Sequence, residues 1–160
     1  MLFKILSISH GWFEVDFNRE FILVNSGFMG CDAPYLLLEA LGDLAENKDT
    51  EAWLCWQGEP GVTILNLEKQ DDRLIVRVYD TDDSLEYINY LQPDHTERRL
   101  SEYAAGRLYK TEDDFVGAVR NILDEFALYE NGNGRIRYEK HWGEFPQEPY
   151  HRVRRLLRGK

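Results

Sequence analysis

Hydrophobic and polar positions alternate near the start of the chain. Residues 13–17 alternate apolar with acidic side chains, and a polar turn at 18–20 leads into the apolar run 21–24. A period of two places successive side chains on opposite faces of a strand. The pattern therefore predicts a β-hairpin whose first strand is half-buried, with a further strand over 3–8 before it.

Three apolar runs follow in the middle of the sequence, at 51–56, 62–67 and 74–79. Short turns rich in glycine or in aspartate separate them, which is typical of an antiparallel meander. Alternation within these runs predicts one shared buried face. We expect that face to hold Val62, Ile64, Leu74, Val76 and Val78.

A helical period marks other segments of the chain. Asp32 is the expected N-cap of a leucine-rich helix that ends near Asn47, and Thr111 is the expected N-cap of a helix with apolar positions spaced along 115–126. Proline at the start and apolar positions facing inward predict a basic terminal helix over about 149–158. Helical and strand-like periods thus occur in the same chain.

The remaining segments are less regular. Residues 80–99 fit either a short helix or an extended segment, 100–109 fit a strand interrupted by glycine, and 135–138 fit a short extended piece. No internal repeat or linker divides the chain. Together the patterns predict a single α+β domain over 1–160, built as an antiparallel meander sheet with about three helices packed on it.

Charge is distributed unevenly along the sequence. The first 150 residues carry 29 acidic and 14 basic side chains, whereas the last ten carry five basic ones and no acidic one. Such an acidic body suits a cationic partner better than phosphate or nucleic acid. Because a helix C-terminus favours cations, we expect the basic tail to pack on its own acidic body.

Catalytic and metal-binding patterns are weak. The chain has no His-x(3–5)-His or Cys-x-x-Cys spacing, no nucleophile elbow and no phosphate loop, so we expect neither a metal site nor a cofactor. Cys31 precedes a helix, where a thiol can become nucleophilic, but a small residue in a tight turn explains it better. The histidines are scattered, at His10, His95, His141 and His151.

Acidic residues gather where the third run of the meander ends. The group consists of Asp80, Asp82, Asp83 and Glu86, and it does not complete a calcium-binding loop. One interpretation is a solvated loop that protects the edge of the sheet. The other is a surface for a basic protein partner, and these four residues are the best candidates for one.

The start of the chain does not resemble a signal peptide, because its apolar stretch is short and contains a lysine. No segment approaches the twenty apolar residues that span a bilayer. Cys31 and Cys55 occur in different contexts, which favours two reduced thiols over a disulfide. These features predict a cytoplasmic protein that uses neither a membrane nor nucleic acid.

Several short segments resemble those of one class of bacterial proteins. They are the 53–61 hairpin (Trp-Leu-Cys-Trp-Gln-Gly-Glu-Pro-Gly), the leucine-rich helix before it, the capped helix at Phe115, and 138–146 (Tyr-Glu-Lys-His-Trp-Gly-Glu-Phe-Pro). In this order they look like the small immunity proteins of polymorphic toxin loci. The resemblance implies a protein that binds and blocks a toxin made by the same cell, and many such toxins are cationic nucleases.

Three functional hypotheses follow. The leading one is a non-enzymatic α+β binding protein that masks a basic toxin domain. The second is a small hydrolase or transferase that uses Cys31 or a pair of carboxylates, as glycosidases do. The third is a self-associating structural protein with a tryptophan-rich face, so both a monomer and a homodimer remain open.

Overall fold

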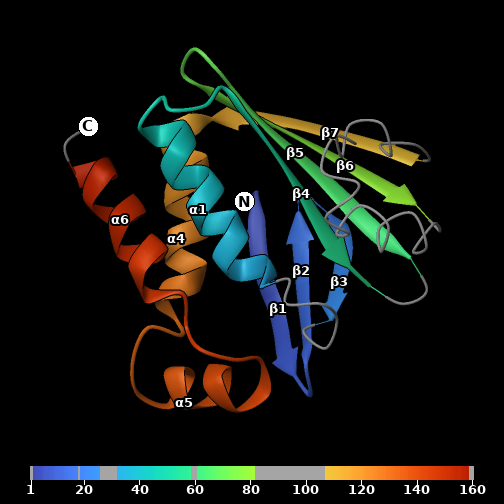
Figure 1. Ribbon diagram of the computed structural model, residues 1–160, viewed down its shortest axis with the longest axis vertical. Coiled ribbons are helices and arrows are strands. Elements are labelled where there is room, and N and C mark those ends of the chain that lie inside the picture. Colours follow the sequence, from blue (N-terminus) through green and yellow to red (C-terminus); the bar gives the residue numbers. More distant parts are fainter. Residues whose placement is uncertain (1, 18, 26–31, 59–60, 82–106, 159–160) are drawn as a thin grey trace, which may run out of the picture.

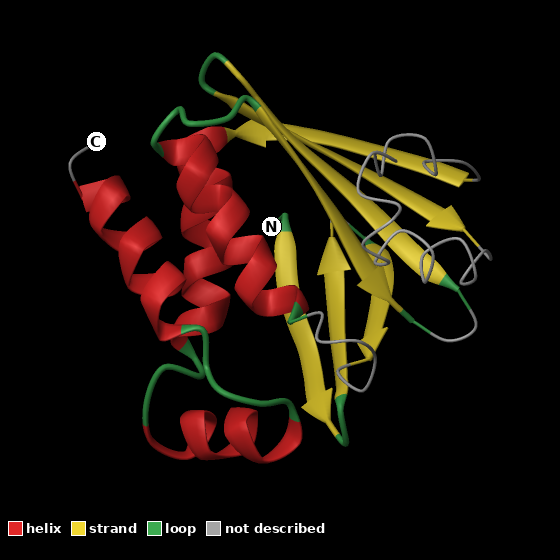
Figure 2. Ribbon diagram, in the orientation of Figure 1, coloured by secondary structure: helices red, strands yellow, loops and turns green. Residues whose placement is uncertain are grey.

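The chain folds into two antiparallel sheets with helices packed against them (Figure 1, Figure 2). The computed structural model describes residues 2–17, 19–25, 32–58, 61–81 and 107–158. Helices and strands occur in one domain, which confirms the predicted α+β class. The antiparallel strands are divided between a three-stranded and a four-stranded sheet.

The first sheet has the order β1 (Phe3–Ser9), β2 (Trp12–Phe17), β3 (Glu20–Asn25). This confirms the predicted hairpin and the strand before it. The β1–β2 turn is tight: His10 and Gly11 have φ angles of 52° and 80°. Two consecutive residues in this left-handed region match the twist of a two-residue hairpin. Apolar side chains alternate into the core along β2, and along β1 as far as the register shift that follows Ile5.

The second sheet has the order β4 (Glu51–Gln57), β5 (Val62–Gln70), β6 (Arg73–Thr81), β7 (Arg107–Asp114). Its first three strands are the predicted meander. Asp71, at a φ of 53°, makes the short turn between β5 and β6. The fourth strand, β7, pairs with β6 along its length and extends the sheet.

The prediction that Val62 and Ile64 of β5 share a buried face with Leu74, Val76 and Val78 is wrong. Ile64 lies opposite Tyr79, whereas Leu65 lies opposite Val78, so the two neighbours face opposite sides of the sheet. Both are buried, because β5 is apolar on both faces and alternation alone does not show which face meets the main core. The main core takes Leu65, Leu67, Leu74, Val76 and Val78, and a second cluster takes Val62 and Ile64 with Cys55, Trp53 and Tyr79.

Helix α1 (Ala33–Ala45) begins where the sequence predicts. The side chain of Asp32 accepts a hydrogen bond from the backbone N–H of Tyr35 at 3.2 Å, as an N-cap does. Glu46 forms the C-cap, close to the predicted end. The leucines of the helix face the core, which confirms the apolar stripe.

Helix α4 (Phe115–Ala127) begins later than the predicted cap. Asp114 is the N-cap, and its carboxylate accepts from the N–H of Gly117 at 2.6 Å. Thr111 instead lies in β7, opposite Val76. The free edge of β6 offers backbone partners to 107–114, and these ladder hydrogen bonds keep the segment extended up to the first helical residue.

The C-terminal part of the chain is helical. The prediction of a short extended piece at 135–138 is wrong, because these residues belong to α5 (Gly132–His141). Within this helix Arg135 and Glu139 form an ion pair one turn apart. Two apolar residues in a basic four-residue segment are too few to distinguish a strand from a helix. The expected basic helix is α6 (Gln147–Arg158), which begins two residues before the predicted start.

The core lies between the helices and the strands. Figure 1 shows α1, α4 and α6 together on one side of the sheets. Buried aromatic rings connect the layers: Phe3 contacts Phe17 with ring centroids 4.8 Å apart, Phe17 contacts Trp56 at 6.0 Å, and Phe3 stacks on Phe126 at 6.1 Å. These rings link both sheets to α4.

The basic helix α6 is docked by ion pairs. Arg152 donates to both oxygens of Glu46, at 3.1 and 2.9 Å, and to Asp43 at 2.5 Å. Arg154 donates to Glu130 at 3.2 Å. The tail therefore packs on the acidic body, as expected, and two of its arginines are held within the chain.

The contact between Arg152 and Glu46 generates a prediction about stability. The hydrogen bond from Arg152, supported by one from Lys48, lowers the pKa of Glu46 to about 2. A depressed carboxyl pKa adds stability that is full above the ordinary value near 4.5 and disappears as the pH falls through about 2.

We expect Arg152→Gln to lower Tm at pH 7 by about 2 to 4 °C, because the pair of carboxylates loses its cation. The deficit should shrink between about pH 4.5 and pH 2. Thermal unfolding followed by circular dichroism at several pH values measures both effects. Arg155→Gln on the same helix is the matched control, and an equal deficit in the control would contradict the assignment.

Candidate functional site

The acidic group expected to meet a partner is only partly placed. Asp80 lies near the end of β6. Asp82, Asp83 and Glu86 lie outside the described residues, and so does Cys31. The acidic patch, and the interpretation of Cys31 as a small residue in a tight turn, therefore stay predictions.

Two of the scattered histidines are neighbours in the fold. The rings of His10 and His141 have centroids 5.4 Å apart, and the carbonyl of His141 accepts the N–H of Gly11 at 2.7 Å. This contact fastens the end of α5 to the β1–β2 turn. In the described part of the chain, no three histidine, cysteine or acidic side chains gather in a group able to hold a metal ion.

The outer face of the first sheet exposes apolar side chains beside carboxylates. Phe21 is 62% exposed and Leu6 is 44% exposed. Leu6 lies at a register shift in β1, beside the position opposite Glu14. We call this surface the acidic–aromatic face. Its residues are Leu6, Trp12, Glu14, Asp16, Phe21 and Leu23, and the exposed Lys4 lies opposite Asp16 on β1.

The pairing of the strands brings the two kinds of side chain together. Glu14 and Asp16 lie on the central strand β2, and they face Leu23 and Phe21 of β3. Trp12 and Leu23 are half-buried. Aromatic residues that remain partly exposed are enriched at the centres of protein interfaces, and carboxylates next to them favour a cationic partner.

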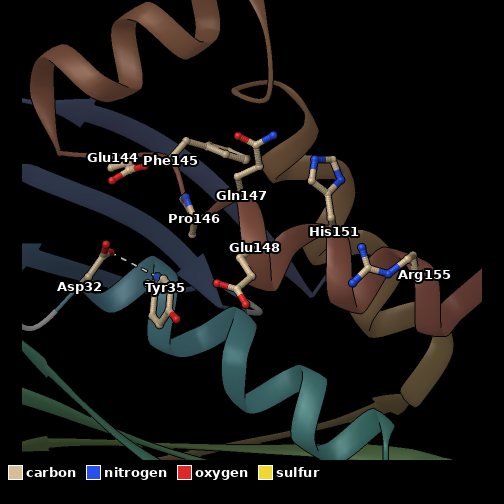
Figure 3. A pocket seen from close by; sticks show the side chains of 9 residues that line it. All are labelled: Asp32, Tyr35, Glu144, Phe145, Pro146, Gln147, Glu148, His151 and Arg155. Atoms are coloured by element: carbon tan, nitrogen blue, oxygen red, sulfur yellow. Dashed lines mark hydrogen bonds between the residues drawn. The ribbon is translucent and has the colours of Figure 1, made fainter.

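A cleft lies where the start of α1 meets α6 (Figure 3). Its volume is about 570 Å³, within the range of small-molecule and peptide sites. Asp32 and Tyr35 line one side, the segment 144–146 lines another, and α6 contributes the third. The side chains from α6 are Gln147, Glu148, His151 and Arg155.

Asp32 connects the two sides of this cleft. Its Oδ1 accepts the indole N–H of Trp142 at 3.1 Å as well as the N–H of Tyr35 at 3.2 Å. Burial raises the pKa of the Asp32 carboxyl, and the hydrogen bonds from Trp142 and Tyr35 oppose this shift. One carboxylate oxygen thus holds the start of α1 against the segment that leads to α6.

Carboxylates surround Tyr35. Its hydroxyl donates to Glu39 at 3.2 Å, and the negative charge of Glu39 is the main cause that raises the Tyr35 pKa. Glu148 and Asp32 raise this pKa further. The cleft therefore has a negative region around Tyr35, while Arg155 extends into it from farther along α6 (Figure 3).

Sequence patterns did not indicate this cleft. The sequence predicts Asp32 as a helix cap, but the hydrogen bond between Asp32 and Trp142 joins residues 110 positions apart. The polar side chains of α6 look like an ordinary solvated helix face in the sequence. Their relation to Tyr35 follows only from the docking of α6 on α1.

Comparison of the chain with protein-family models, with curated proteins and with solved structures found no match. Among the described helices, none has the length and apolar character needed to cross a membrane.

The contact between Asp32 and Trp142 generates the second prediction. Trp142→Phe keeps a ring against Phe13, whose centroid is 5.5 Å away, but removes the N–H donor. We expect a loss of about 1 kcal/mol in the free energy of unfolding at pH 7, measured by urea titration.

The pH dependence of this loss tests its cause. Without the N–H of Trp142, the pKa of the half-buried Asp32 should rise further, and a raised carboxyl pKa removes stability as the pH increases through it. The deficit should therefore be larger at pH 7 than at pH 3.5. In an Asp32→Asn background it should lose this pH dependence, and a deficit that stays pH-dependent there would contradict the assignment.

Proposed function

We propose that the protein is a non-enzymatic binding protein of the cytoplasm that neutralises a basic protein partner, as an immunity protein does with its cognate toxin. The acidic–aromatic face carries the proposal. It combines an exposed Phe21, a half-buried Trp12 and two carboxylates on one antiparallel sheet. A rigid sheet presents such side chains with little loss of conformational entropy on binding.

Charge supports the same proposal. The formal net charge of the chain is −10, although its C-terminal helix is basic. Arg152 and Arg154 of that helix are bound to carboxylates of the same chain. These two arginines therefore stabilise the fold and are not free to bind an external anion. The remaining negative charge of the chain is available to steer a cationic protein toward it.

The other hypotheses have weaker support. An enzyme would need two carboxylates, or a thiol and a base, held around a substrate, and Asp32 is already engaged in capping and in the contact with Trp142. Self-association could use the acidic–aromatic face, but facing copies would bring the carboxylates of both chains together. Measurement of the solution mass by light scattering separates a homodimer from a monomer.

The neighbouring gene is the first place to look for the partner, and a toxin encoded there would be the test protein. Co-expression should restore growth of cells that make the toxin, and the two purified proteins should form a complex. We expect Phe21→Ala and Glu14→Lys each to weaken the affinity at least tenfold, by loss of a central contact and by charge repulsion. Glu14→Lys should also slow association and reduce its dependence on salt.

Asp49→Lys is the matched control, because Asp49 is exposed in the turn before β4, away from the acidic–aromatic face. It should keep most of the affinity. Reversal of charge at Asp80, Asp82, Asp83 and Glu86 tests the second predicted surface in the same assay. If growth is not restored and no complex forms, the immunity proposal is wrong. If the complex forms but tolerates Phe21→Ala and Glu14→Lys, another surface makes the contact.

A further inference from the structure

We propose that the cleft between α1 and α6 binds short peptides with free ends, holding the ammonium group near Glu148 and the terminal carboxylate at Arg155. This inference concerns a different surface from the acidic–aromatic face and does not rest on the proposed function.

The two kinds of charge lie at different ends of the cleft. Figure 3 shows Asp32 and Glu144 toward one end and Arg155 toward the other, with Glu148 between them. A cleft with separated charges of opposite sign suits a ligand that is itself dipolar. A simple anion would be repelled by the carboxylates of the cleft, and a simple cation would form no ion pair with Arg155.

The arginine of the cleft, Arg155, differs from its neighbours on α6 in its contacts. Arg152 and Arg154 each bind a carboxylate of the fold, whereas Arg155 has no carboxylate within ion-pair distance among the described residues. The hydrogen bonds of Asp32 to Trp142 and Tyr35 both use Oδ1.

Helix geometry sets the length of the ligand. Glu148 and Arg155 are seven residues apart on α6, which corresponds to two turns and about 10 Å along the axis. An extended peptide advances about 3.3 Å per residue, so about three residues separate an ammonium from a carboxylate over this distance. The cleft volume of about 570 Å³ accommodates a chain of this size.

The walls of the cleft suit a peptide backbone. Phe145 and Pro146 are buried and provide an apolar floor, and Tyr35 lies beside the acidic end. An ammonium group gains a cation–π interaction from an aromatic ring and charge-assisted hydrogen bonds from carboxylates. Gln147 offers an amide that can both donate to and accept from the peptide groups.

The test uses the full chain and the tripeptide Ala-Ala-Ala, with amide chemical shifts recorded by NMR during titration. Shifts should concentrate at Tyr35 and along 144–155. We expect N-acetylation or C-amidation of the tripeptide to weaken binding at least tenfold each, and single alanine to bind more weakly than the tripeptide because it reaches only one end.

Variants then assign each end of the ligand. In Arg155→Gln the free and the C-amidated tripeptides should bind alike, because the partner of the carboxylate is gone. In Glu148→Gln the affinities of the free and the N-acetylated tripeptides should differ less than they do in the unmodified chain. Arg158→Gln changes a neighbouring exposed arginine of α6 outside the cleft and should leave all affinities unchanged.

Three results would overturn the proposal. One is equal binding of the free and the doubly capped tripeptide, and another is no binding at millimolar concentration by a chain whose spectrum shows it to be folded. The third is a set of shifts located on the acidic–aromatic face. Glu14→Lys should leave tripeptide binding unchanged, so failure here and failure of the proposed function give separate signals.

Discussion

The docking of α6 on α1 is the contact on which the rest of the arrangement depends. Arg152 binds two carboxylates at the end of α1, and a Cβ atom at Gly42 would lie only 3.0 Å from its guanidinium. Glycine at this point allows the arginine to lie across the helix. The ion pairs, together with the buried side chains Tyr150, Val153 and Leu157 of α6, hold this helix and the segment that carries Trp142 against α1.

The same docking explains the role of the charge asymmetry. A basic tail on an acidic body looks like a surface for anions when only the sequence is considered. In the fold, Arg152 and Arg154 form ion pairs with carboxylates of the same chain, so the basic tail stabilises the packing of α6 on the rest of the chain. Arg155 lies on the same helix but on the side of the cleft. The position of each arginine around the helix, and not the number of arginines, decides what it does.

Local signals were sufficient for most elements of the fold. The alternation at 13–17, the cap at Asp32 and the leucine stripe that follows it each depend on a few neighbouring residues, and each is confirmed. The start of α4 was wrong because Thr111 has a cap-like sequence but lies at the edge of β6, where a strand satisfies its backbone. Residues 135–138 were wrong because a short basic segment carries too little pattern to distinguish strand from helix.

The candidate sites could not be predicted from the sequence for a different reason. The acidic–aromatic face depends on the register that sets Glu14 opposite Leu23 and Asp16 opposite Phe21, and the cleft depends on contacts between residues more than 100 positions apart. Neither surface has a motif, because its residues come from separate strands or helices. The structure also separates the two surfaces, one on the outer side of a sheet and one between helices. The two proposed surfaces therefore do not overlap, and a macromolecule bound at the acidic–aromatic face would leave the cleft open to a small ligand.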